Sequence, residues 1–210
     1  MKYFDSLPFL ANRDSDNNIY VTRNILVRTK MISQLAKNPL LFYQYALQDG
    51  DTPEIVANKY YGTSYRYWIV LQGNPNILDP QFDWPYSNQQ FILYLKDKYA
   101  EAAGGADQVL SYINGTVHHY EKIITTVDNN TQTTAIKNVE IDEDTYNSLT
   151  QFSQTQSFAD GSSVKYTVSK TAISIYDYEN NLNESKRNIN LINSTYVNQM
   201  ETQYQSLVKS

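Results

Sequence analysis

The clearest pattern in the chain is a pair of short helical stretches, each with a start signal and a stop signal. Thr52 stands before Pro53 and an apolar stripe, and an N-cap followed by proline is typical of a helix start. Gly62 tolerates a positive φ and is expected to end this helix. Ser64 is expected to cap the second helix, and Gly73 to end it. Helices this short cannot each bury an apolar face alone, so they must pack on another element.

Strand-like segments lie on both sides of this helical pair. The aromatic and apolar run at 40–48 has the length of a strand and is the expected packing partner of the two helices. Residues 19–21 and 25–32 also have strand composition, and residues 188–192 alternate polar and apolar positions. A final helix with one apolar face is expected after its cap, Ser194.

The middle of the chain predicts a longer helix followed by a hairpin. Ser87 is expected to cap a helix over 88–102. Beyond it, apolar runs at 109–113 and 117–127 are separated by Asn-Gly at 114–115. Asn-Gly between apolar runs is a strong hairpin signal, so both runs are expected to be strands.

Further turn signals separate two more expected strands, at 133–141 and 164–168. The acidic residues at 142–144 favour the start of a short helix that reaches Phe152. Residues 172–186 combine a strand-favouring half with a helix-favouring half, and either structure fits them.

These elements predict an α+β protein with an extended N-terminal arm, a compact core of two helices and strands, a connecting helix, a β-rich insert, and a C-terminal strand and helix. The expected bounds of these parts are 1–37, 38–86, 87–105, 106–170 and 171–210. Residues 1–18 hold few periodic signals but several large apolar side chains. Such a segment either docks on its own domain or reaches a neighbouring subunit.

Composition narrows the classes of function. Of the 210 residues, 41% are hydrophobic, only 19% are charged, and 19 are tyrosine. A tyrosine-rich surface of low charge is typical of contacts between proteins, although a compositional bias of the source organism explains it equally well. A net charge of -5 argues against nucleic acid as the main partner. With neither a signal segment nor an apolar run of about 20 residues, no membrane partner is expected.

Signals for an enzyme are weak. The only histidines, His118 and His119, would point to opposite faces of a strand and could not share a metal ion. The acids within 140–144 cluster at a helix start, which is typical of a solvated cap. Trp68 is expected in the core, whereas Trp84 fits either packing or sugar stacking. We therefore expect no catalytic residue, no metal, no cofactor and no small-molecule ligand.

Residues 40–86 resemble a LysM domain. The resemblance rests on Gly50-Asp51-Thr52 after a strand, on Tyr60-Tyr61-Gly62, on Trp68 and on Asn74. It implies a LysM-like βααβ unit, and in many relatives it implies binding to peptidoglycan or chitin.

A longer series of motifs resembles the baseplate wedge protein 53 family of T-even-like contractile-tailed bacteriophages. These motifs are Asp51-Thr52-Pro53-Glu54, Trp68-Ile69-Val70-Leu71, Asp83-Trp84-Pro85, Val117-His118-His119-Tyr120-Glu121 and Asn183-Glu184-Ser185-Lys186-Arg187. The resemblance implies a structural, non-enzymatic protein of the virion tail baseplate, assembled in the host cytoplasm. It would join wedges into the hexameric baseplate under the contractile sheath. The implied partners are other wedge subunits and adjacent wedges, in a hetero-oligomer with sixfold symmetry.

The aromatic residues have a different role under each hypothesis. In a wedge protein the LysM-like unit is a scaffold, and contacts with partner proteins are expected near the termini and in the proline-rich loop. The residues expected at such an interface are Tyr3, Phe4, Phe9, Trp84, Tyr86 and Tyr204. The alternatives are a LysM-type peptidoglycan-binding module and a peptidoglycan hydrolase.

Overall fold

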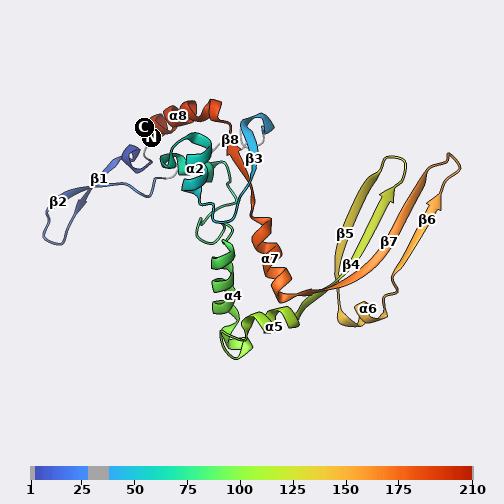
Figure 1. Ribbon diagram of the computed structural model, residues 1–210. Helices are drawn as coiled ribbons and strands as arrows, with labels where there is room; N and C mark the ends of the chain where they lie inside the picture. The colour runs from blue at the N-terminus through green and yellow to red at the C-terminus, as the bar shows by residue number, and fades with distance from the viewer. Residues whose placement is uncertain (1–2, 28–37, 210) are drawn as a thin grey trace. The chain divides into compact units, whose positions relative to one another are not determined.

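The computed structural model describes residues 3–27 and 38–209 (Figure 1). The chain divides into two compact units. Unit 1 holds the described residues of Met1–Gln90 and Asn183–Ser210, and unit 2 holds Phe91–Leu182. Both helices and strands are well represented, which confirms the predicted α+β class.

Unit 1 combines short helices with a two-stranded sheet. Its strand β3 pairs antiparallel with β8, which comes from the other end of the chain. A separate hairpin is formed by β1 and β2. The elements are η1 (Phe4–Ser6), β1 (Phe9–Arg13), β2 (Ile19–Arg23), η2 (Pro39–Leu41), β3 (Phe42–Ala46), α2 (Pro53–Tyr61), η3 (Ser64–Arg66), α3 (Tyr67–Gln72), β8 (Asn188–Ile192), η4 (Ser194–Tyr196) and α8 (Val197–Lys209).

Local sequence signals predicted the ends of the helices of unit 1 to within one residue. Thr52 caps α2 through its side chain, and Gly62 ends it in the left-handed region at φ 73°. The second cap was predicted one residue late, because Thr63 rather than Ser64 accepts the capping hydrogen bond of η3. Asn193 likewise replaces the predicted Ser194 as the cap before α8. In both places a 3₁₀ turn precedes the α-helix and shifts the cap.

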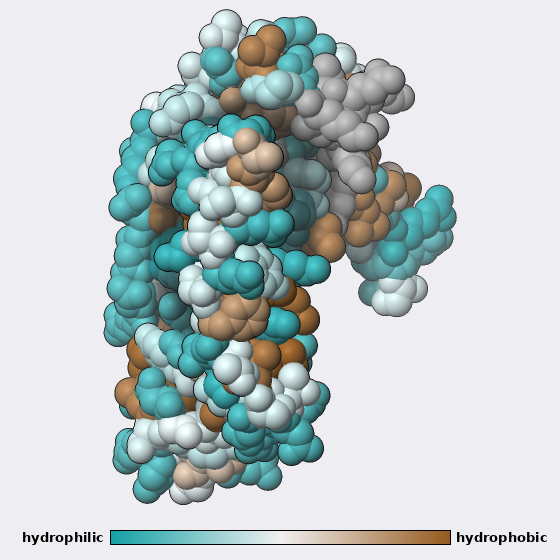
Figure 2. Space-filling view, turned by 90° about the vertical axis from the view of Figure 1, so that its right-hand side faces the viewer, coloured by the Kyte–Doolittle hydropathy of each residue, from teal (hydrophilic) through white to brown (hydrophobic). Residues whose placement is uncertain are grey.

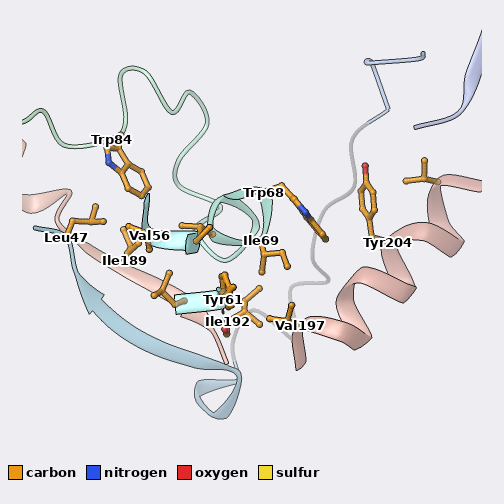
Figure 3. Close-up of a cluster of buried hydrophobic side chains, with 14 of the residues drawn as sticks. Leu47, Val56, Tyr61, Trp68, Ile69, Trp84, Ile189, Ile192, Val197 and Tyr204 are labelled. Carbon is orange, nitrogen blue, oxygen red and sulfur yellow. Dashed lines mark hydrogen bonds between the residues drawn. The ribbon is translucent and has the colours of Figure 1, made fainter. Parts of the chain in front are cut away.

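The core of unit 1 lies between α2, α3, α8 and the β3–β8 sheet (Figure 3). Ile189 and Leu191 are buried while the intervening Asn190 is exposed, as the alternation predicted. Trp68 is 3% exposed, which confirms its predicted place in the core. The other buried members are Leu7, Leu47, Val56, Ala57, Tyr61, Ile69, Val70, Trp84, Ile192, Val197, Tyr204 and Val208.

One buried asparagine joins α3 to the outer edge of β8. The Asn74 Nδ2 donates to the carbonyl oxygens of Val70 and Asn190, both at 2.8 Å. Its Oδ1 accepts from the Asn190 backbone N–H at 2.8 Å. A Cβ at Gly73 would lie 2.8 Å from the Asn190 carbonyl oxygen, so glycine permits this close approach. The Asn74 side chain thus takes the place of a neighbouring strand.

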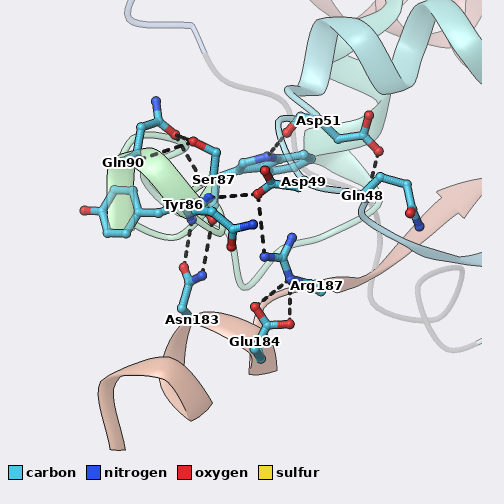
Figure 4. Close-up of polar contacts among 11 residues, drawn as sticks. Gln48, Asp49, Asp51, Tyr86, Ser87, Gln90, Asn183, Glu184 and Arg187 are labelled. Atoms are coloured by element: carbon cyan, nitrogen blue, oxygen red, sulfur yellow. Dashed lines mark hydrogen bonds and ion pairs between the residues drawn. The ribbon is translucent and has the colours of Figure 1, made fainter. Parts of the chain in front are cut away.

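Polar contacts hold together the two places where the chain leaves and re-enters unit 1 (Figure 4). Asn183 is buried, and its amide accepts from the Tyr86 N–H at 2.7 Å and donates to the Tyr86 carbonyl at 3.2 Å. Asp49 accepts from the Asn88 N–H at 2.8 Å and lies 4.0 Å from the Arg187 guanidinium. These contacts fix the start of α4 beside the end of α7.

Unit 2 contains a four-stranded antiparallel sheet in the order β5-β4-β7-β6. The helices α4 and α7 cross the boundary between the units. The elements are α4 (Asn88–Ala103), α5 (Val109–Gly115), β4 (Val117–Asp128), β5 (Thr133–Ile141), α6 (Glu143–Ser148), β6 (Phe152–Ser157), β7 (Ser163–Ser174) and α7 (Ile175–Ser185).

Several predictions for these regions were wrong. Residues 109–115 form helix α5, because Val109 and Ile113 bury one helical face and Asn-Gly ends a helix instead of turning a hairpin. Phe152 begins β6 and is not part of α6. The strand expected at 25–32 does not begin at Ile25, which lies in a turn, and 28–32 falls outside the described residues.

The two histidines do not lie on opposite faces, which corrects the prediction. The pairing of β4 with β7 shifts register between Val117 and His119, so an irregularity reorients the side chains. The Nδ1 atoms of His118 and His119 approach to 2.9 Å. The His118 ring stacks on Tyr178, with 3.8 Å between ring centroids.

A buried carboxylate ties α4 to α7 within unit 2. Glu179 is 3% exposed and accepts from the Lys98 ammonium and the Tyr99 hydroxyl, both at 2.6 Å. Burial alone would raise the pKa of Glu179, but the hydrogen bonds and charge of Lys98 and the tyrosine hydroxyls outweigh it, and the pKa lies below its ordinary value. Glu179 is therefore held as a charged group.

Candidate protein interface

The hairpin of β1 and β2, drawn in blue in Figure 1, exposes large apolar side chains to solvent. Five residue pairs form its ladder, from Phe9 opposite Arg23 to Arg13 opposite Ile19. The exposed apolar residues of the hairpin and the turn after it are Phe9, Leu10, Ile19, Tyr20, Val21, Ile25 and Leu26. An isolated two-stranded hairpin is marginally stable in water, and soluble surfaces seldom expose such a cluster without a binding role.

The base of this hairpin is fixed to the core of unit 1. Leu7 is 2% exposed, and the Tyr3 ring lies 5.1 Å from Tyr204 and 5.9 Å from Trp68 between ring centroids. The Arg23 guanidinium donates to the Leu7 carbonyl oxygen at 3.1 Å. The segment before β1 is thus an anchor, and the strands after it expose large apolar side chains.

The six residues predicted at an interface divide between surface and core. Phe4 and Phe9 are exposed, and Tyr3 and Tyr86 are partly buried. Trp84 and Tyr204 are 6% and 4% exposed, so their side chains pack within this chain. Sequence reasoning did not single out Ile19, Val21, Ile25 and Leu26. The signal that could have identified them is a strand-like apolar segment in the N-terminal part of the chain. That part has too few residues to bury the segment.

A groove in unit 1 runs between residues 50–54 and residues 80–87. The Trp84 indole N–H donates to the Asp51 carbonyl oxygen at 2.6 Å, so Trp84 supports the groove wall and offers little face for stacking. The Asp51 carboxylate accepts from Lys59 at 2.6 Å and from the Tyr45 hydroxyl at 3.0 Å. Burial would raise the pKa of Asp51, but these hydrogen bonds outweigh it and keep the carboxyl ionised.

In 3–27 and 38–209, no group of three or more His, Cys, Asp or Glu side chains could hold a metal ion. Over the same residues, no helix combines the length and the apolar character that crossing a bilayer requires. The exposed hairpin therefore remains the candidate site on which a function can be argued.

Comparison with known proteins identifies the class to which this chain belongs. It is a member of the base plate wedge protein 53 family, whose model matches residues 1–207. This confirms the family resemblance found in the sequence. The chain is similar to the baseplate wedge protein gp53 of Enterobacteria phage T4, with 25% identity over 130 residues. The matched region covers 60% of this chain and 64% of the relative, so the chain spans less than two thirds of that protein.

Proposed function

We propose that this chain is a structural, non-enzymatic component of a phage tail baseplate wedge. In this proposal it joins wedges into the hexameric baseplate under the contractile sheath. This assembly takes place in the host cytoplasm. Its partners are other wedge subunits and adjacent wedges, in a hetero-oligomer with sixfold symmetry. The family match over residues 1–207 is the observation that carries the proposal.

The exposed hairpin offers a surface through which this chain could bind another wedge subunit. Its apolar residues are open to solvent, while its anchor is buried through Leu7. Covering such side chains with a partner would remove apolar surface from water at about 25 cal/mol per Å². We propose that a wedge subunit covers this hairpin, with Phe4 and Phe9 at the edge of the contact.

Complementation of a phage that lacks this chain tests the proposal, with a matched pair of substitutions. Leu26 and Leu78 are both 83% exposed, but Leu26 follows the hairpin and Leu78 lies in the proline-rich loop. Leu26→Asp is expected to block baseplate assembly, because a charge at a covered apolar contact must be desolvated. Leu78→Asp is expected to support assembly.

The readout is electron microscopy of lysates, with tryptophan fluorescence of the purified variants as the folding control. The Leu26→Asp variant should give a native spectrum and unjoined wedges. Normal sixfold baseplates without this chain would contradict the proposal. Retention of the purified chain on peptidoglycan would instead favour the LysM-type binding alternative, for which the buried Trp84 offers little support.

A further inference from the structure

Strand β6 forms an open edge of the sheet in unit 2, with β7 as its only neighbour in the described sheet (Figure 1, orange). The stretch from 145 to 159 contains no charged residue and no proline. Natural edge strands are usually protected by charges, proline or bulges. The opposite edge, β5, carries Lys137 and Glu140. Figure 2 shows many polar and intermediate side chains, with brown apolar patches among them.

The sequence of this edge reads the same in both directions. Residues 152–158 are Phe-Ser-Gln-Thr-Gln-Ser-Phe, with Thr155 at the centre. When two copies of a strand pair antiparallel, one runs in reverse, so a palindrome places each residue opposite its own kind. The pairs would be Phe with Phe, Ser with Ser, Gln with Gln and Thr with Thr. Aromatic and hydroxyl pairs of this type stabilise a sheet.

The outward-facing backbone groups of β6 belong to residues that such an antiparallel pairing would place opposite one another. The Phe158 N–H donates to the Ser162 carbonyl at 2.8 Å, so Phe158 points its backbone toward β7. This direction alternates along an antiparallel strand. The N–H and C=O groups of Ser153, Thr155 and Ser157 therefore point to the open edge. A two-fold axis at Thr155 pairs Ser153 with Ser157 of a second copy, which gives about six new hydrogen bonds.

We propose that β6 pairs antiparallel with β6 of a second copy of this chain, about a two-fold axis at Thr155. The two four-stranded sheets would then form one continuous sheet. Ile124, Val168 and Phe152 are cross-strand neighbours on one face. An axis perpendicular to the sheet keeps this face on the same side in both copies, so Phe152 of one copy would lie opposite Phe158 of the other.

This contact is separate from the proposed joining of wedges. A sixfold rotation alone creates head-to-tail contacts, whereas the β6 contact uses the same surface on both chains. The two-fold pair is therefore proposed for copies of the chain that are not part of a sixfold ring. Baseplate complementation and self-association of the purified chain report the two proposals independently.

Sedimentation of the full chain over a range of concentrations tests the β6 pair. The native chain is expected to show a monomer–dimer equilibrium. Thr155→Lys places two like charges opposite each other at the axis and should weaken dimerisation by about fivefold or more. Thr134→Lys, a matched change on the exposed face of β5, should leave it unchanged. A native chain that stays monomeric, or equal effects of the two variants, would overturn the proposal.

Charge reversal provides a second measurement that a folding defect could not imitate. Thr155→Lys and Thr155→Glu should each dimerise poorly alone and should recover as a mixture, because the axis then pairs opposite charges. The chain has no cysteine, so Thr155→Cys can also be tested for a disulfide between copies. The expected Cα separation of about 5.5 Å lies within the disulfide range. Failure of the mixture to recover, or equal cross-linking by Thr134→Cys, would exclude this register.

Discussion

Replacing Asn74 by leucine tests how β8 is held in unit 1. Asn74 is 3% exposed. Its side-chain amide makes hydrogen bonds to the Val70 carbonyl and to both backbone groups of Asn190. Leucine has the same number of side-chain heavy atoms and the same branching, but it neither donates nor accepts hydrogen bonds. Asn74→Leu therefore removes the polar contacts while keeping the branched shape of the side chain.

The expected loss follows from counting these bonds. Asn74 makes three, each at 2.8 Å. A typical hydrogen bond contributes about 1 kcal/mol net, so Asn74→Leu should lower the free energy of unfolding by about 3 kcal/mol. Asn190 is exposed as a residue, so water can reach its backbone groups in part. The loss should therefore stay below the cost of fully buried, unpaired groups.

Urea unfolding followed by tryptophan fluorescence measures this loss in unit 1 alone, because both tryptophans, Trp68 and Trp84, lie there. Asn76→Leu is the matched control, since Asn76 is exposed and follows in the same loop. Its effect should stay within about 0.5 kcal/mol. If Asn74→Leu were no more destabilising than Asn76→Leu, the amide would not be what secures β8, and the reasoning would fail.

Three further predictions concern the turn, the charge cluster and the unit boundary. Gly62→Val should lower the stability of unit 1 by about 1–2 kcal/mol, because φ is 73° there, whereas Gly62→Asn should cost less; equal urea midpoints would contradict this. The pKa of Glu179 is lower in the folded state, so ionised Glu179 stabilises unit 2 above the ordinary pKa of about 4.3, and this contribution is lost as pH falls through the folded value. Glu179→Gln should therefore reduce the acid sensitivity of amide exchange in α4 and α7; an unchanged pH profile would contradict this. Replacing 91–182 by a short Gly-Ser linker should preserve native fluorescence of Trp68, because the Asn183–Tyr86 hydrogen bonds keep the flanking ends together; loss of cooperative unfolding would show that unit 1 needs unit 2.

Signals that act over a few residues predicted much of the fold. The cap at Thr52, the stop at Gly62 and the alternation at 188–192 all depend on neighbours in sequence, and each appears in the structure. The wrong prediction of a strand at 109–113 also came from a signal over a few residues. A five-residue apolar run fits a strand or one face of a short helix, and the burial of Val109 and Ile113 decides between them only in three dimensions.

Pairings over long distances could not be read from the sequence in the same way. Nothing local indicates that β3 pairs with β8, because partner choice depends on register and packing over the whole chain. The candidate interface shows a related limit of local patterns. The apolar residues of β2 resemble those of a buried strand, and only the absence of a covering layer on Val21 and its neighbours in the described structure distinguishes them.

The order of the elements links the proposed interface to completion of the chain. Tyr3, which precedes the hairpin, packs against Tyr204 in α8, and β3 pairs with β8 beyond residue 187. Contacts between such distant segments form late, because the intervening chain must first be made and its loop-closure entropy overcome. A chain that ends before β8 lacks both Tyr204, which packs on Tyr3, and the strand that pairs with β3. The part of the hairpin's anchor that Tyr3 and Tyr204 provide can thus form only after the C-terminal segment has been made.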